Sequence, residues 1–432
     1  MSRKSVSSTA LLHADPTSLT LRLVRVIPRG ALISLATEGM EQCRAAAQAP
    51  ELRRIMLVAN TGWNILRFRG PLIEALVEQG YDVTVVADFS PEQLADSRRM
   101  GASPYSLRID AAGLNPSADL GYGIGLYRLL RRLRPDLVHF FTIKPIVYGV
   151  LAAKLTGTPG IVAALTGSGI VQAGRRPLLA PLVRLLLQLA FAGRTRAIFQ
   201  NATDLAVFAR QQLVTADRAY LIAGSGVDTS RLAPVPEDRG RKRRMFVMAS
   251  RMLWSKGVGD FVAAARLVKG RQPEAEFVLF GGAQDAYGSK YPDFVDRAWL
   301  EALNAEGTVA WRGWTPPDVV EAAMRHAAAV VLPSTYGEGV PRSLIEAAAA
   351  GAPIITTDTP GCRDTVLANE SGFICRANAP EDLAAAMLEL LQRPDLVRTM
   401  GMSARQVALE RFDKVHIVRR TLEVYAAALA AP

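Results

Sequence analysis

The sequence predicts an α/β protein with two domains, each built on a parallel sheet. One observation is the length, because 432 residues are too many for a single ordinary core and favour two domains of roughly 150 to 200 residues. A second is the alternation, in both halves of the chain, of short apolar stretches typical of buried strands with stretches typical of helices. A third is the composition, since 50% of the residues are hydrophobic and 21% are charged, as is usual for a globular α/β enzyme.

The charge distribution indicates which kinds of partner the chain binds, and the cysteine content indicates the compartment in which it works. Residues 53–225 hold 20 Lys and Arg against 11 Asp and Glu, whereas residues 240–432 hold 23 against 22, so the first half carries most of the net charge of +11. A basic half favours a membrane surface or a phosphorylated substrate, because no nucleic-acid-binding motif is present. The three cysteines, Cys43, Cys362 and Cys375, show no metal-ligand spacing, which fits a reducing cytoplasm.

We interpret residues 1–52 as an N-terminal extension. The apolar stretch 19–36 contains spaced arginines and is compatible with a membrane surface, although Pro28 and Gly30 break any single helix. Charges interrupt the apolar run, so we do not interpret it as a signal peptide. A disordered or loosely attached extension is the favoured alternative.

The first domain is expected over residues 53–225 and begins with a β-α-β unit. Strands at 53–60 and 81–88 flank a glycine-containing loop at 61–70 and a helix at 71–80. Open parallel sheets bind ligands at the carboxyl ends of their strands, so this loop supplies candidates for ligand contact, namely Gly62, Trp63 and Asn64. Alternatively, Trp63 packs at the interface between the domains.

A later part of this domain places a cation at the same sheet edge. A basic helix is predicted at 126–135, and the next strand contains His139 and leads into a loop with Lys144. Because the carboxyl ends of parallel strands share one edge, Lys144 is expected near Gly62, where its ammonium suits a phosphate.

The segment 175–196 is apolar and has arginines at both ends. Between Pro177 and Gly193 it spans 17 residues with Arg184 as the only charge. This is short for a transmembrane helix, so we predict that the segment lies on a bilayer surface, where its flanking arginines attract anionic headgroups. The alternative is a buried core helix.

Residues 226–243 have the glycines, prolines and charges of a linker, and a second domain is expected over 244–405. Its first strand delivers Arg251 to its carboxyl end, and Lys256 precedes a glycine and a helix. Two cations at such a junction suit a diphosphate, because arginine offers a planar fork of donors and lysine a point charge. A chance pair of surface cations is the alternative.

The stretch 336–358 has the order loop, helix, strand. Gly339 permits unusual backbone angles in the loop, and Pro341 suits the first helical position. Glu338 lies in the loop and Glu346 about one and a half turns into the helix. The free N–H groups of the helix start favour a phosphate or a sugar hydroxyl. The alternative is a solvated glutamate in an alanine-rich helix.

The residues Glu338-Gly-Val-Pro, then Glu346, then Gly-Ala-Pro-Ile-Ile, resemble the donor-binding signature of the family-4 retaining glycosyltransferases, which have the GT-B fold. The resemblance extends from about residue 54 onward. It implies two Rossmann-like domains that face each other across a cleft, the first binding the acceptor and the second the nucleotide sugar. It also implies that a last helix within 406–432 crosses back to the first domain.

The resemblance assigns a role to each matching residue. Glu338 faces the donor sugar and Glu346 bonds the ribose, while Arg251 and Lys256 hold the diphosphate and stabilise the leaving nucleotide. The expected catalytic residues are therefore Glu338, Arg251 and Lys256. Further donor-binding residues are Gly339, Val340, Pro341, Gly313 and Trp314. The expected acceptor-binding residues are Gly62, Trp63, Asn64 and Lys144.

Residues 141–149 resemble a subgroup that adds sugars to polyprenyl-diphosphate-linked oligosaccharides. Two positions depart from the wider family. Phe141 stands where the family often has a second histidine, so His139 is expected to be structural. Ala202 replaces the proline of an Asn-Pro-x-Asp turn.

Other chemistries are not indicated. The segment 121–127 imitates a dinucleotide-binding fingerprint, but Leu126 stands where a third glycine is needed and no strand precedes the segment. The sequence contains neither a P-loop nor Asp-x-Asp, so no metal is expected, and Arg251 and Lys256 supply the positive charge instead.

We therefore expect a metal-independent, retaining glycosyltransferase without a cofactor, which moves a hexose or N-acetylhexosamine from a UDP-sugar to a polyprenyl-diphosphate-linked acceptor in bacterial cell-envelope polysaccharide synthesis. Its expected partners are the nucleotide sugar, the acceptor and the anionic inner face of the cytoplasmic membrane, and not nucleic acid. One alternative is a UDP-sugar epimerase of the same fold, which would need further acid-base residues. The other is a catalytically silent nucleotide-sugar-binding protein, against which the intact set of donor-site residues argues.

Overall fold

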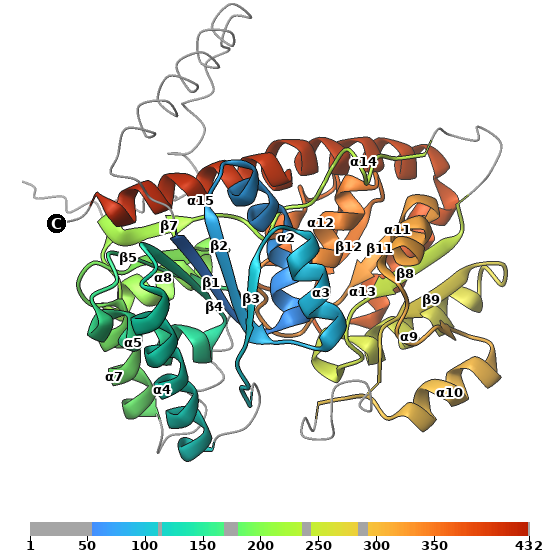
Figure 1. The fold of residues 1–432 in the computed structure, drawn as a ribbon. Helices are drawn as coiled ribbons and strands as arrows, with labels where there is room; N and C mark the ends of the chain where they lie inside the picture. The colour runs from blue at the N-terminus through green and yellow to red at the C-terminus, as the bar shows by residue number, and fades with distance from the viewer. Residues whose placement is uncertain (1–53, 111–114, 168–179, 236–242, 284–292, 431–432) are drawn as a thin grey trace, which may run out of the picture. The chain divides into compact units, whose positions relative to one another are not determined.

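The structure, a computed structural model, describes residues 54–110, 115–167, 180–235, 243–283 and 293–430 (Figure 1). The chain divides into two units, Met1–Glu51 and Leu52–Pro432, and all described residues belong to the second. That unit contains a seven-stranded and a six-stranded sheet, and the strands within each pair in parallel. The predicted α/β class with two parallel-sheet domains is confirmed, whereas the predictions for residues 1–52 lie outside the described residues.

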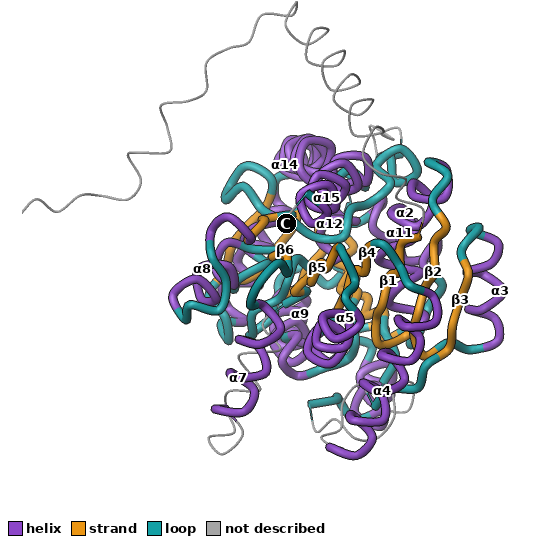
Figure 2. Tube along the Cα trace, turned by 60° about the vertical axis from the view of Figure 1, so that its left-hand side comes forward, coloured by secondary structure: helices purple, strands orange, loops and turns teal. Residues whose placement is uncertain are grey.

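The first sheet has the strand order β3-β2-β1-β4-β5-β6-β7, and Figure 2 shows β1 to β6 side by side. Its central strands are almost wholly apolar, because helices cover both faces, as is usual for parallel sheets. The strands are β1 (Arg54–Thr61), β2 (Asp82–Asp88), β3 (Ser103–Ser106), β4 (Leu137–Phe141), β5 (Gly160–Leu165), β6 (Arg196–Phe199) and β7 (Ala219–Leu221).

The two faces of this sheet bury different helices. On one face lie α2 (Gly62–Glu78), α3 (Pro91–Arg99) and α15 (Lys414–Leu429). On the other face a second core is enclosed by α4 (Pro116–Leu133), the π-helical turn η1 (Pro145–Gly149), α5 (Val150–Thr156), α7 (Ala180–Phe191) and α8 (Ala202–Arg210). The short turn η2 (Ala216–Arg218) precedes β7.

The second sheet has the strand order β10-β9-β8-β11-β12-β13 and encloses one continuous apolar core with its helices. The strands are β8 (Met245–Ala249), β9 (Glu276–Phe280), β10 (Ala310–Trp311), β11 (Ala329–Leu332), β12 (Ile354–Thr357) and β13 (Gly372–Cys375). The helices are α9 (Val258–Lys269), α10 (Arg297–Glu306), α11 (Pro317–His326), α12 (Arg342–Ala349), α13 (Pro380–Gln392) and α14 (Pro394–Val407). Short helical turns are η3 (Trp254–Lys256), η5 (Arg363–Thr365) and η6 (Ala408–Phe412).

The helix α15 follows the second sheet in the chain but packs on the first. It contacts β5, β4 and α2, and its Tyr425 is buried in the core on that face (Figure 1). At its start, the side chain of Asp413 accepts a hydrogen bond from Val415 N and caps the helix. Lys414 pairs with Asp228 at 2.8 Å, so the segment that precedes the second sheet meets the start of the last helix.

The prediction of a loop at 61–70 is wrong, because these residues form the first half of α2. The Thr61 side chain accepts a hydrogen bond from Asn64 N at 3.2 Å and caps the helix, and Pro71, the predicted helix start, lies inside it. Proline offers no N–H to the carbonyl of the preceding turn, but the buried apolar side of α2 holds the helix on the sheet. The three candidate residues therefore occupy the first turn of a helix at the carboxyl end of β1.

Candidate functional site

Arg251, Lys256 and Glu338 lie at the carboxyl ends of two adjacent strands of the second sheet. Arg251 follows β8, Lys256 ends η3, and Glu338 lies in the loop between β11 and α12. The Lys256 ammonium forms an ion pair with Glu338 Oε1, to which Ser334 Oγ donates at 3.1 Å. The ammonium also lies 5.2 Å from the ring centre of Tyr336. The fold thus brings together groups that lie far apart in the sequence.

The two cations of this cluster differ in burial and in whether they have a partner. Burial alone lowers the pKa of Lys256, but the charge of Glu338 and their hydrogen bond outweigh it, so the pKa lies above the ordinary lysine value. Arg251 is exposed, and its side chain has no hydrogen bond or ion pair with any residue in the described ranges. Arg251 is available to an anionic ligand. Lys256 can bind such a ligand only when its ion pair with Glu338 breaks.

Glu346 lies in α12 and is held by two arginines from different parts of the chain. Its Oε1 accepts from Arg342 Nε at 2.8 Å, one turn earlier on α12, and from Arg67 Nη2 at 2.5 Å, on α2 of the first sheet. Arg67 Nη2 also lies 3.2 Å from Glu321 Oε1, and Arg231 binds both oxygens of Glu321 at 2.5 and 2.6 Å. The carboxylate expected to bind a ribose is therefore occupied by an arginine that the sequence analysis missed.

The loop that carries Glu338 is held by two side chains of the first sheet's carboxyl edge. Asn201 Nδ2 donates to the carbonyl of Glu338 at 3.0 Å and to that of Gly339 at 3.3 Å, while Val340 N donates to Gln200 Oε1 at 3.2 Å. A Cβ atom on Gly339 would lie 2.0 Å from Gln200 Oε1 and 2.9 Å from the backbone of Thr166, so a side chain at this position would require the backbone to shift. Asn201 belongs to the turn that resembles the family's Asn-Pro-x-Asp motif, which was the available sequence indication.

The helix α12 begins close to its predicted start. Pro341 was predicted to be its first helical residue, whereas in the structure Pro341 is the N-cap, one position earlier. Gly351, just after the helix, has a φ of 71°, which a residue with a side chain adopts at a cost.

Gly62, Trp63 and Asn64 lie at the carboxyl edge of the first sheet, and only part of this set faces solvent. Trp63 is 50% exposed and meets Phe68 edge-on, with ring centres 5.3 Å apart. Gly62 is buried, and a Cβ atom on it would lie 2.3 Å from the ring of Phe89, so its role in the structure is close packing. An acceptor contact therefore remains a prediction that suits Trp63 better than Gly62.

Lys144 has an acidic partner that the sequence analysis did not foresee. Its Nζ lies 2.6 Å from Asp119 Oδ1 and 2.6 Å from the carbonyl oxygen of Asp110. Tyr148 donates to the other oxygen of Asp119 at 3.2 Å. A phosphate at Lys144 would have to compete with Asp119, so the predicted acceptor role stays a prediction.

His139 is buried within β4, and its Nδ1 lies 2.8 Å from the hydroxyl of Tyr425. Burial and the nearby charge of Arg69 keep the pKa of His139 well below its ordinary value. A neutral, buried imidazole tied to α15 is consistent with the structural role expected for it.

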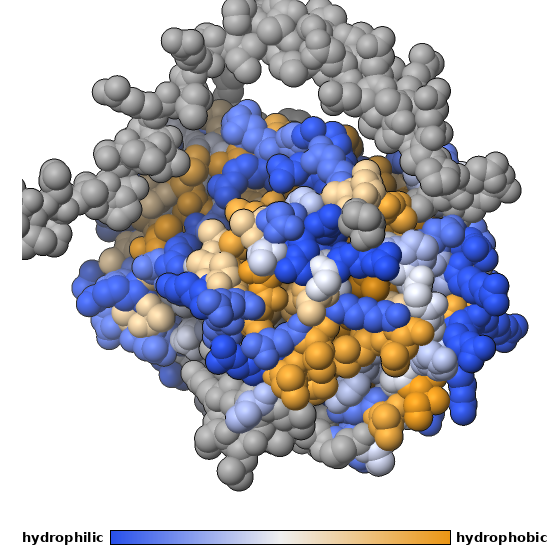
Figure 3. All heavy atoms as spheres, turned by 90° about the vertical axis from the view of Figure 1, so that its left-hand side faces the viewer, coloured by the Kyte–Doolittle hydropathy of each residue, from blue (hydrophilic) through white to orange (hydrophobic). Residues whose placement is uncertain are grey.

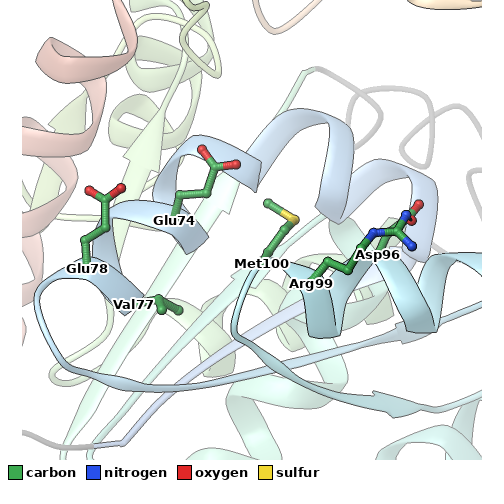
Figure 4. Close-up of a pocket in the computed structure, with 6 residues that line it drawn as sticks. All are labelled: Glu74, Val77, Glu78, Asp96, Arg99 and Met100. Carbon is green, nitrogen blue, oxygen red and sulfur yellow. Dashed lines mark hydrogen bonds and ion pairs between the residues drawn. The ribbon is translucent and has the colours of Figure 1, made fainter.

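Two surface cavities differ in what lines them. A cavity of about 510 Å³ lies at the end of β10. Gly313 and Trp314 line it, together with Gly282, Trp311 and Arg297. Trp314 is 60% exposed there, which leaves a flat aromatic face for a planar ligand group. A second cavity of about 530 Å³, between α2 and α3, contains none of the predicted site residues (Figure 4).

The helix α7 covers most of the described part of the predicted membrane segment, and residues 168–179 lie outside the described ranges. Leu187, Ala190 and Phe191 are buried in the first domain's core, whereas Leu185 and Leu189 are 51% and 47% exposed. One side of the helix thus packs in the core, as the alternative interpretation expected, whereas contact of its exposed side with a bilayer stays a prediction. Within the described ranges, none of the helices combines the length and apolar character needed to cross a membrane.

The described residues also contain no group of three or more histidine, cysteine, aspartate or glutamate side chains arranged to hold a metal ion.

Replacing Arg67 with methionine is expected to tighten UDP binding by roughly tenfold. The ribose that the resemblance expects at Glu346 would have to displace Arg67, and a hydrogen bond to a charged group contributes about 1.5 to 3 kcal/mol. The fold should tolerate the change, because Glu321 keeps Arg231 and Glu346 keeps Arg342. Titration calorimetry with UDP measures the effect, and Arg98→Met on the surface of α3 is the control. Weaker binding would show that Arg67 assists the nucleotide.

Comparison with known proteins gives two family matches. The family model described as "Glycosyl transferases group 1" matches residues 234–407, and the one described as "Glycosyl transferase 4-like" matches residues 54–201. The first therefore covers most of the second sheet and its helices, and the second covers most of the first sheet.

Two bacterial enzymes are similar along most of their length. The N,N'-diacetylbacillosaminyl-diphospho-undecaprenol alpha-1,3-N-acetylgalactosaminyltransferase of Campylobacter jejuni is 28% identical over 386 residues, covering 86% of this chain and 98% of that enzyme. The UDP-Gal:alpha-D-GlcNAc-diphosphoundecaprenol alpha-1,3-galactosyltransferase of Escherichia coli is 25% identical over 370 residues, covering 82% and 90%. A glycosyltransferase structure from Rickettsia africae superposes with a TM-score of 0.68 at 16% identity, covering 88% of this chain and all of that one.

Proposed function

Because the chain belongs to the GT-B glycosyltransferases of the family-4 type, we propose that it moves a sugar from a UDP-sugar to a polyprenyl-diphosphate-linked acceptor, with retention of configuration and without a metal ion. The sugar is a hexose or an N-acetylhexosamine. The reaction belongs to the synthesis of a bacterial cell-surface glycan and takes place at the inner face of the cytoplasmic membrane.

One observation carries the proposal: two cations and a carboxylate lie together at the carboxyl ends of β8 and β11, where the resemblance expects the diphosphate and sugar of a donor. Arg251 and Lys256 are placed to balance the charge that develops on a departing diphosphate, and stabilisation of developing charge by preorganised groups contributes more to catalysis than any other effect in many enzymes. Glu338 lies beside them and is fixed from the first domain through its backbone carbonyl. Glu346 on the following helix provides a carboxylate for a ribose hydroxyl.

The similar enzymes support the substrate classes. Both are named for acceptors that carry a diphospho-undecaprenol, and the Escherichia coli enzyme is named for UDP-Gal. One transfers a hexose and the other an N-acetylhexosamine, so both sugar classes are represented. Both names specify an alpha linkage, which retention of configuration produces from an alpha-linked nucleotide sugar.

A donor panel tests the proposal. The protein is incubated with individual UDP- and GDP-sugars and an undecaprenyl-diphosphate-linked monosaccharide, with and without EDTA, and the lipid product is followed by chromatography. We expect transfer from a UDP-sugar at a rate that EDTA does not change. Loss of transfer in EDTA, restored by manganese, would contradict the metal-independent part. Conversion of the UDP-sugar to its epimer, or UDP binding without any turnover, would contradict the transferase.

The first domain offers a surface for the membrane that holds such an acceptor. Exposed apolar side chains occur on three helices of one face, α4, α5 and α7, and we call them the apolar face: Leu120, Ile124, Leu155, Leu185 and Leu189. Figure 3 views this side of the molecule and shows hydrophobic side chains gathered beside hydrophilic ones. Exposed arginines lie on the same helices, at Arg128, Arg131, Arg132 and Arg184. Leucines that enter the headgroup region and arginines that attract anionic lipid would act together.

Replacing Leu185 and Leu189 with serine is expected to weaken binding to anionic vesicles about 10- to 30-fold, because each half-exposed leucine contributes roughly 1 kcal/mol when fully buried. Sedimentation with phosphatidylglycerol vesicles measures binding, and high salt should release part of the protein. Leu186 is left unchanged because it packs on the core. The control pair is Leu267→Ser with Leu409→Ser, two exposed leucines of the second domain. Equal loss in both pairs, or no vesicle binding by the unmodified protein at low salt, would contradict this surface.

A further inference from the structure

A small, mostly enclosed cavity of about 20 Å³ lies where α2, β4 and α15 meet, and none of the predicted donor-site residues lines it. Its polar lining residues are Arg69, His139, Gln200, Ser225 and Thr421, and apolar side chains complete the wall. A space of this size holds about one water molecule or one monatomic ion.

Arg69 brings an unbalanced positive charge to this cavity. It is only 8% exposed, its guanidinium lies 4.4 Å from the ring centre of Phe141, and its Nε is buried without a hydrogen-bond partner. No residue in the described ranges forms an ion pair with Arg69. A second cation, Arg342, lies close enough to lower the pKa of Arg69 further by its charge. Burial lowers the pKa of Arg69 to about 10, so the guanidinium stays protonated at neutral pH.

His139 supplies a second polar atom without a partner. It is 2% exposed, and its Nε2 is buried without a hydrogen-bond partner. The hydroxyl of Tyr425 lies 2.8 Å from Nδ1, and burial raises the pKa of Tyr425, so the phenol keeps its proton. An anion beside Nε2 selects the neutral tautomer that has its proton on Nε2, with the Tyr425 hydroxyl donating to Nδ1.

Gln200 adds further donor capacity. Its Oε1 accepts from Val340 N, so the amide N–H groups remain for other partners. The hydroxyl of Ser225 already accepts from Arg342 Nη1 at 3.3 Å, and that of Thr421 donates to the carbonyl of Ile417 at 2.7 Å. The cavity is thus surrounded by donors and one full positive charge, with no anionic group among the residues that line it.

We propose that this cavity binds a small inorganic anion of the halide class, such as chloride, between Arg69 and His139. A buried charge without a counter-ion is strongly unfavourable. A water molecule would satisfy the hydrogen-bond donors but not the charge, whereas a monatomic anion satisfies both. The bound anion joins α2 and β4 to α15, and it stabilises the attachment of the last helix to the first sheet.

The site is tested by thermal unfolding in sodium chloride and in sodium gluconate at equal ionic strength. We expect chloride to raise the unfolding midpoint by roughly 2 to 4 °C, because a ligand that binds only the folded state stabilises it. Arg69→Met should abolish this difference and, in gluconate, should unfold no earlier than the unmodified protein, because it removes an unpaired buried charge. The exposed variant Arg128→Met should keep the full chloride response.

An equal midpoint in chloride and gluconate for the unmodified protein, or an unchanged chloride response in Arg69→Met, would overturn the proposal in favour of a water molecule. Crystals of the unmodified protein grown with bromide provide a test that does not depend on a variant's folding. An anomalous peak between Arg69 and His139 is expected, and its absence would also overturn the proposal.

Discussion

Replacing Arg251 with alanine is expected to lower kcat about 100- to 1000-fold, which is the usual effect of removing one preorganised donor to a transition-state charge. Arg251 stands at the carboxyl end of β8, exposed and without a side-chain hydrogen bond or ion pair in the described part of the chain, so its replacement removes no such contact there. The midpoint of thermal unfolding should therefore stay nearly unchanged. Steady-state kinetics with a UDP-sugar and a lipid-linked acceptor, together with circular dichroism on heating, measure both quantities.

Lys256→Ala should lower kcat to a similar degree, but it should also lower the unfolding midpoint. Lys256 is buried and forms an ion pair with Glu338, and its removal leaves that carboxylate with the hydroxyl of Ser334 as its remaining side-chain partner among the described residues. Sequence analysis treats the two cations alike. In the structure the two differ, because Lys256 is buried and paired with Glu338 whereas Arg251 is exposed. Arg251→Ala is therefore the cleaner test of catalysis.

Arg271→Ala provides the matched control, since Arg271 is an exposed arginine of the same domain that follows α9. It should leave both kcat and the unfolding midpoint unchanged. If Arg251→Ala retained near-normal kcat, Arg251 would not balance charge on a departing diphosphate, and the catalytic assignment would be wrong.

The features that sequence analysis predicted correctly depend on local patterns. Buried strands of parallel sheets are continuous apolar runs, so most strands and the two-sheet organisation follow from the order of residues. The placement of Arg251, Lys256 and Glu338 at one sheet edge follows from the same rule, because the carboxyl ends of parallel strands share an edge.

The features that it missed depend on contacts between distant segments or on a local conflict. Arg67 meets Glu346 across 279 positions of sequence, and neither local pattern indicates the other. The acidic partner of Lys144 is Asp119, which lies 25 positions earlier in the first turn of α4, ahead of the stretch 126–135 that was predicted as a helix. In α2, proline is typical of a helix start, and the tertiary packing of the preceding turns overrides that preference at Pro71.

Glu338→Gln is expected to lower kcat about 100-fold or more while leaving UDP affinity unchanged or higher. The amide keeps the shape of the carboxylate but removes a charge that is expected to face the donor sugar in the transition state. In the structure, the carboxylate of Glu338 forms an ion pair with the ammonium of Lys256. Removing its charge frees Lys256 for the phosphates of UDP, so ground-state binding should not suffer. Kinetics and titration calorimetry on the same preparation separate the two effects.

Glu346→Gln should show the opposite division, with a weaker affinity for UDP and a smaller loss of kcat. The ribose hydroxyl expected at Glu346 would bond it in the ground state and the transition state alike, and the loss of such uniform binding raises KM more than it lowers kcat. The change also leaves Arg67 and Arg342 without their shared carboxylate, although Arg67 keeps Glu321. Circular dichroism therefore accompanies the titration to confirm folding. If UDP affinity fell for Glu338→Gln and stayed unchanged for Glu346→Gln, the two glutamates would have exchanged roles, and the donor would lie in the opposite direction along the edge of the second sheet.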